Sequence, residues 1–179
     1  MNFGQNLKRS AKISFIVVSL LAHFMLAVAV NYAFPHYDDA LITGGEVKRM
    51  DKDGLVSTAN PADGPTRDVY FVYTQEANST KVMPYRNEDT RWGFPFYFKF
   101  NSADVQAVAQ SFAGEQKLVQ VKFYGWRIAL LDEFRNIISI REIKDVSELS
   151  NPIMTYVFYV LLLVSFGFSV RVIKRLFDK

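Results

Sequence analysis

Two long apolar runs, one near each end of the chain, dominate its pattern of hydrophobic and polar positions. Residues 13–34 and 153–170 contain no Asp, Glu, Lys or Arg. About 20 helical residues are enough to cross a hydrocarbon core of roughly 30 Å. We therefore expect transmembrane helices at residues 13–34 and 153–173, with short tails at 1–12 and 174–179.

Residues 35–152, between the two runs, are numerous enough for one compact domain. Segments rich in β-branched and aromatic residues predict strands at residues 41–50, 68–74, 81–86, 118–128 and 137–143. Gly44 and Gly45 predict a bulge in the first of these strands.

One helix is predicted inside the domain, beginning at Asn101 or Ser102 and ending near Gly114. The spacing predicts that an apolar stripe faces the core and that two glutamines face away from it. The stripe consists of Val105, Val108 and Phe112, and the glutamines are Gln106 and Gln110.

The order of elements is three strands, a helix and two strands, so the predicted fold class is a β-rich α+β domain between two transmembrane helices. This order is also that of a five-stranded OB-like barrel with one helix. Another small α+β sheet fits the same order, and both interpretations stay open.

Charge is distributed unevenly along the chain. Residues 1–12 carry +3, residues 171–179 carry +3, and residues 35–152 carry 14 basic against 17 acidic residues. Positive flanks stay in the cytoplasm, which predicts a bacterial inner-membrane protein with cytoplasmic termini and a periplasmic domain. A mildly acidic domain argues against nucleic acid as a partner.

The first apolar run has one competing interpretation. Ala27-Val28-Ala29 resembles a signal-peptidase site, but residues 13–34 are longer than the apolar part of most signal peptides. We expect a retained anchor.

The composition removes most familiar catalytic and metal-binding chemistry. The chain has no Cys and only two His, so it lacks thiolate ligands, a cysteine nucleophile and a disulfide framework. We expect no cofactor and no metal. The tract at residues 36–39 (HYDD) is interpreted as a cap at the membrane interface rather than a metal site.

The densest polar cluster lies at residues 85–92. Adjacent Glu88 and Asp89 could act as general acid and base, but successive side chains of an extended segment point to opposite faces. With Arg86 and Arg91 beside them, they fit a loop with local ion pairs better.

An aromatic run follows at residues 92–100. If this run is extended, Trp92, Phe94, Phe96, Phe98 and Phe100 share one face. They then form part of a core strand or packed loop, or they are exposed and bind a partner or the membrane interface.

A third motif is Tyr124-Gly125-Trp126-Arg127. Gly125 predicts a bend, Trp126 is expected in the core, and Arg127 is expected to pair with Glu88 or Asp89.

Several segments together resemble a family of small bacterial inner-membrane proteins classified as a domain of unknown function. They are the YRNED…WGFPFYFKF and SADVQA segments of residues 85–107 and the YGWRI segment of residues 124–128. The chain departs from the family pattern at Arg91, where the family usually has Gly, and at Asn101, where it has Asp. The resemblance implies the two-span layout and brings no activity with it.

We interpret the chain as a non-catalytic accessory, assembly or scaffolding protein that binds the lipid bilayer and another envelope protein, with a homo-oligomer left open. The predicted partner surface comprises Arg86, Glu88, Asp89, Arg91, Trp92, Phe94, Phe96 and Tyr97. One alternative is a membrane-anchored ligand-binding or sensing module with Trp92, Tyr97 and Trp126 in its pocket. The second is a membrane-bound hydrolase using Glu88 and Asp89.

The topology makes a direct prediction. Alkaline phosphatase fused after Asp63 should be active, because the enzyme folds only after export and this position is predicted to be periplasmic. An inactive fusion, with normal expression, would contradict the predicted topology.

Overall fold

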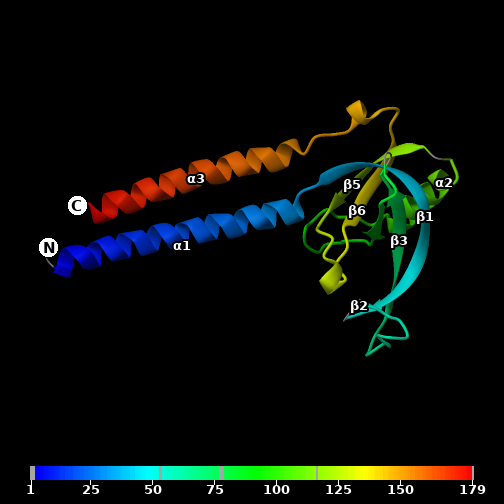
Figure 1. Cartoon of the computed structure of the whole chain (residues 1–179), viewed down its shortest axis with the longest axis horizontal. Helices are drawn as coiled ribbons and strands as arrows, with labels where there is room; N and C mark the ends of the chain where they lie inside the picture. Colours follow the sequence, from blue (N-terminus) through cyan, green and yellow to red (C-terminus); the bar gives the residue numbers. More distant parts are fainter. Residues whose placement is uncertain (1–2, 53, 77–78, 116, 179) are drawn as a thin grey trace. The chain divides into compact units, whose positions relative to one another are not determined.

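The computed structural model describes residues 3–52, 54–76, 79–115 and 117–178, and it consists of two compact units. One unit contains the two terminal helices, and the other spans Ala33–Pro152. Figure 1 shows the helices and the sheet domain in chain colours. The predicted general architecture, a β-rich domain flanked by two long apolar helices, is confirmed.

The helical unit pairs α1 (Phe3–Ala33) with α3 (Ile153–Phe177). Both helices are long and apolar enough to be candidate membrane spans. They run antiparallel, because Lys12 contacts Asp178 at 2.6 Å while Asn31 donates to the Tyr159 hydroxyl at 3.0 Å. Both helices extend beyond the apolar runs into the basic flanks, where nothing in the sequence stops them.

The sheet domain is built around one long strand. β1 (His36–Asp51) pairs antiparallel with β5 (Leu118–Tyr124) through its first half and with β3 (Arg67–Gln75) through its second half. A two-residue strand, β2 (Gly54–Leu55), folds back on the end of β1.

The remaining pairings return to β1. β3 pairs antiparallel with β4 (Val82–Asn87), and β6 (Asn136–Glu142) pairs antiparallel with β5. β4 and β6 meet in parallel at one register pair, Arg86 with Asn136. Strand pairing therefore follows the closed circuit β1–β3–β4–β6–β5–β1.

The predicted order of three strands, a helix and two strands is present, with β2 and two short 3-10 turns added. These turns are η1 (Ala129–Leu131) and η2 (Val146–Glu148). The tract at residues 36–39, interpreted from the sequence as a cap at the membrane interface, forms the start of β1. Asp38 within it accepts hydrogen bonds from Tyr85 Oη at 2.6 Å and Arg135 Nη1 at 2.8 Å.

The core lies inside this circuit and is closed at one side by α2 (Ser102–Phe112). Its centre contains Val72, Tyr85, Val119, Val121 and Ile137, all essentially inaccessible to solvent. The helix contributes Val105 and Ala109.

The predicted inner face of α2 was partly wrong. Gln106 is buried and Val108 is exposed, the reverse of the sequence-based expectation. Gln106 points inward because its amide bonds to two groups of the sheet, the Asn87 side chain at 3.2 Å and the Phe71 carbonyl at 3.3 Å.

The bulge predicted at Gly44–Gly45 is present as a register shift between Ile42 and Gly44. The glycine at position 45 has a separate reason, because a Cβ there would lie 2.6 Å from Gln106 Nε2 and 2.9 Å from the Phe71 carbonyl oxygen. The close approach of the helix to the sheet therefore requires glycine at this position.

Truncating the core should show how much the closed circuit depends on it. Ile137→Ala removes a fully buried side chain and should lower the free energy of unfolding by about 2–5 kcal/mol. The exposed Val82→Ala should change it by less than about 0.5 kcal/mol. Denaturant unfolding of the detergent-solubilised full chain would measure both, and equal effects would contradict this core.

Candidate functional site

The segment between β4 and α2 forms an irregular loop rather than the extended strand considered from the sequence. We call residues 91–100 the aromatic loop. Turns form where Gly93 N donates to the Thr90 carbonyl and Phe96 N to the Gly93 carbonyl, both at 2.8 Å. Arg91, Phe96 and Phe98 have positive φ angles, and the Phe94–Pro95 peptide is cis.

Arg91 occupies the position where the resembled family usually has glycine. Its φ of +48° lies in the left-handed region, which glycine adopts without strain. The tight turn before Trp92 is therefore present in this chain despite the arginine.

Alternate side chains of the aromatic loop point to opposite sides, as the sequence predicted. The outward rings are 54–75 % exposed, and they belong to Trp92, Phe94, Phe96, Phe98 and Phe100. They contact one another, because Trp92 lies 5.5 Å from the ring centroids of both Phe98 and Phe100, and Phe94 lies 5.9 Å from Phe96. The loop thus presents two groups of exposed rings, one around Trp92 and one formed by Phe94 and Phe96.

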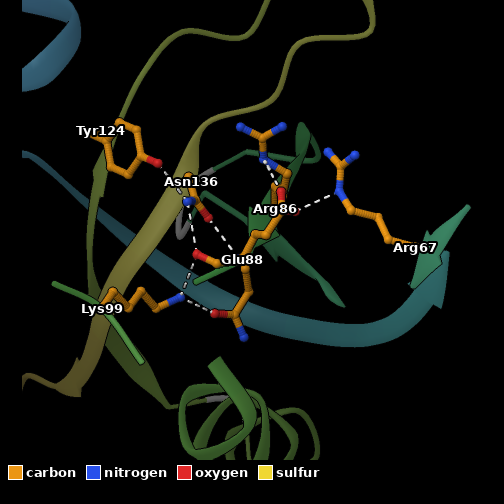
Figure 2. Close-up of polar contacts among 7 residues, drawn as sticks. Arg67, Arg86, Glu88, Lys99, Tyr124 and Asn136 are labelled. Atoms are coloured by element: carbon orange, nitrogen blue, oxygen red, sulfur yellow. Dashed lines mark hydrogen bonds and ion pairs between the residues drawn. The ribbon is translucent and has the colours of Figure 1, made fainter. Parts of the chain in front are cut away.

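Lys99 points inward from the same loop and is only 4 % exposed. Its ammonium donates to the Oδ1 of fully buried Asn87 and lies 3.4 Å from the Glu88 carbonyl oxygen (Figure 2). Burial lowers the pKa of Lys99 to about 8, against the opposing effect of the charges on Asp89 and Glu88.

Asn136, the first residue of β6, joins the end of β4 to the rest of the domain. Its Oδ1 accepts from Glu88 N at 2.9 Å, and its Nδ2 donates to the Glu88 carbonyl at 3.0 Å and to Tyr124 Oη at 2.8 Å (Figure 2). The amide side chain thus bonds to the backbone of the residue two positions after Arg86, the β4 member of the β4–β6 register pair. We call the buried residues Asn87, Lys99, Gln106, Tyr124 and Asn136 the polar cluster.

Tyr97 ties the aromatic loop to the start of the domain. Its hydroxyl donates to the carbonyl of Ala33, the last residue of α1, at 2.6 Å. Its ring stacks on Tyr124 with centroids 5.3 Å apart. Burial raises the pKa of Tyr97, so its hydroxyl stays a hydrogen-bond donor at physiological pH.

The two adjacent carboxylates diverge, as the sequence analysis argued. Glu88 forms a 2.7 Å ion pair with Arg67 Nε, and Arg86 Nε lies 3.5 Å away, a contact without hydrogen-bond geometry (Figure 2). Asp89 accepts from Ser102 N at 2.8 Å and so caps the amino end of α2, which its negative charge favours. Asn101, at the N-cap, makes no side-chain capping bond.

The third motif is partly corrected. Gly125 has a φ of +82°, which confirms the predicted bend, and Trp126 is only partly buried. Arg127 does not reach Glu88 or Asp89. Its guanidinium lies 4.1 Å from the centroid of the Phe134 ring, and its Nη1 donates to the Glu133 carbonyl at 2.9 Å.

Sequence reasoning missed most of the polar cluster. Lys99 was the one available signal, because a lysine inside a run of aromatic residues must either leave the surface they form or interrupt it. Among the described parts of the chain, no group of three or more His, Asp or Glu residues could hold a metal ion.

The buried ammonium generates a prediction on pH. Between pH 8 and the ordinary lysine pKa of 10.5, the unfolded chain keeps a proton that folded Lys99 has released, so stability rises with pH. Below pH 8 both states are protonated and the full cost of the buried charge is present.

The matched variant Lys99→Met lacks this titration. The free energy of unfolding of the original chain should therefore rise relative to that of the variant from about pH 8 to about pH 10. Parallel pH profiles in denaturant titrations of the two proteins would contradict the buried, charged lysine.

Comparison with known proteins assigns the chain to a protein family. The family described as "Protein of unknown function (DUF1523)" matches residues 11–177. An uncharacterized protein of Haemophilus influenzae is 57 % identical over 164 residues, which cover 92 % of this chain and 93 % of that protein. No solved structure matches. The chain therefore belongs to the DUF1523 family.

Proposed function

We propose that the chain is a non-catalytic accessory, assembly or scaffolding protein of the bacterial inner membrane. In this proposal α1 and α3 cross the membrane, both termini are cytoplasmic, and the sheet domain is periplasmic and binds another envelope protein. The two-span part is supported by the length and apolar character of the helices and by the basic residues at their outer ends.

Polar groups inside the helical unit also fit a membrane setting. His23 Nδ1 lies 2.7 Å from the Ser19 carbonyl oxygen, and its Nε2 lies 3.2 Å from Ser165 Oγ on the other helix. Asn31 bonds to Tyr159 across the same pair. In a hydrocarbon environment such groups need partners, and these pairs provide them.

We assign the sheet domain to the OB-like class. The closed circuit, the parallel contact between the third and fifth long strands (β4 and β6) and the helix between the third and fourth support this assignment. OB folds are predominantly binding modules, and they commonly use the surface of their second and third strands, here β3 and β4.

The observation that carries a binding rather than a catalytic role is that the candidate acid–base pair is used structurally. The Glu88 carboxylate is paired with Arg67, and the Asp89 carboxylate caps α2. The two therefore do not converge on one reacting atom, which weighs against the hydrolase alternative.

A polar hollow of about 240 Å³ lies beside β3 and β4 and supports binding at this surface. It is lined in part by Asp38, Thr74, Lys81, Tyr85 and Arg135. The ligand-binding alternative is a second candidate on the same observation, although its expected pocket residues Trp92, Tyr97 and Trp126 do not line this hollow.

Purification of the tagged full chain from membranes in mild detergent tests the proposal. We expect a companion protein in stoichiometric amount by intact-complex mass determination. Lys81→Glu reverses a charge beside the hollow and should lower recovery of the companion about tenfold. A loss of roughly 1.4 kcal/mol of binding free energy is sufficient for this effect.

The matched control is Lys144→Glu, which reverses the charge of another exposed lysine away from the hollow and should leave recovery unchanged. A chain that purifies alone from native membranes would contradict the accessory role. Equal recovery with both variants would contradict binding at the β3–β4 surface.

A further inference from the structure

The aromatic loop exposes five aromatic rings within nine residues. Each of these rings is at least 54 % exposed, and Trp92 is 75 % exposed. Exposed apolar side chains gathered in one loop mark a site for a protein partner or a membrane. The ring contacts of Trp92 with Phe98 and Phe100 hold these three rings together without burying them.

The loop is attached at the residue where a candidate membrane span ends. Tyr97, between the exposed Phe96 and Phe98, donates to the carbonyl of Ala33, and Ala33 is the last residue of α1. If α1 crosses the bilayer, this bond keeps the aromatic rings beside the point where the chain leaves the hydrocarbon. Tryptophan and other aromatic side chains are enriched at that depth.

A second apolar tip emerges from the same end of the domain. Leu130 and Leu131, in η1 between β5 and β6, are 93 % and 65 % exposed. Their connection begins after Tyr124, which pairs in register with Asn136 and stacks on Tyr97. In Figure 1 this yellow-green connection and the green loop after β4 lie on the side of the domain where β1 begins.

Charge at the aromatic loop favours a membrane surface. Residues 91–100 contain no acidic residue, and Arg91 is their exposed basic side chain because Lys99 is buried. Arg91 is exposed beside Trp92. Cationic side chains next to inserted rings are attracted to anionic lipid headgroups.

We propose that the aromatic loop and the Leu130–Leu131 tip insert into the boundary between headgroups and acyl chains in the leaflet from which α1 emerges. This inference rests on the two-span part of the proposed function. It assigns Trp92, Phe94 and Phe96 to lipid rather than to the protein partner predicted from the sequence. The protein partner is left to the β3–β4 surface.

The absence of native cysteine allows a direct test in the full chain. Three single-cysteine variants would be labelled with an environment-sensitive fluorophore and reconstituted into vesicles of phosphatidylethanolamine and phosphatidylglycerol. Phe96→Cys reports the aromatic loop, and Val82→Cys is a control of similar exposure at the opposite end of β4. Phe24→Cys reports the middle of the apolar run 13–34 within α1.

We expect the label at position 96 to show blue-shifted emission, loss of quenching by aqueous iodide, and quenching by nitroxide placed shallow in the lipid. The label at position 82 should behave as if in water, and the label at position 24 should be quenched best by deep nitroxide. Phe94→Cys should repeat the result for position 96, which guards against a local effect of one substitution.

Three outcomes would overturn the inference, and they tell its failure from that of the proposed function. Water-like behaviour at position 96 with a lipid environment at position 24 would refute insertion and leave the two-span anchor standing. Water-like behaviour at both positions would refute the anchor and insertion together. Protection of position 96 in native membranes alone would assign the loop to a protein partner and refute the lipid assignment.

Discussion

The hydrogen bonds between the Asn136 side chain and the backbone of Glu88 are the interaction on which the domain depends most. β4 and β6 share one register pair, so the parallel side of the circuit has few backbone bonds of its own. The amide of Asn136 adds two bonds to backbone groups immediately after β4. Arg86 N also donates to the Arg135 carbonyl at 2.9 Å. The Asn136 amide therefore extends a short stretch of backbone pairing to the start of the segment that leads into the aromatic loop.

The polar cluster lowers the stability of the domain but defines the conformation of the aromatic loop. Burying an ammonium group costs free energy even when it is hydrogen-bonded, and the lowered pKa of Lys99 is the measure of that cost. In return, Lys99 and Tyr97 fix two inward positions of a loop whose other rings have little core to pack into. A buried network of this kind is sensitive to the loss of any member, because each remaining partner is then left unsatisfied.

Local patterns were sufficient to predict the order of the elements and the bulge at Gly44–Gly45. They failed where a polar side chain has its partner far away in the sequence. Asp38 was interpreted only as part of an interfacial cap because it lies just after the first apolar run, yet it pairs with Arg135, 97 residues away. Gln106 was predicted to face away from the core because it lies outside the apolar stripe of its helix. Nothing in that helix shows that Asn87 and the Phe71 carbonyl are there to bond it. Long-range polar pairing leaves no periodic signal, whereas apolar periodicity does.

The short connection between α1 and β1 limits how far the domain can reach from the end of α1. α1 ends at Ala33 and β1 begins at His36, so two residues separate them. Two extended residues span only about 7 Å. With α1 as a membrane anchor, such a tether would confine the sheet domain to a thin layer next to the bilayer. It would then meet other proteins by lateral diffusion, and the parts of a larger protein that it could engage would be those closest to the lipid surface.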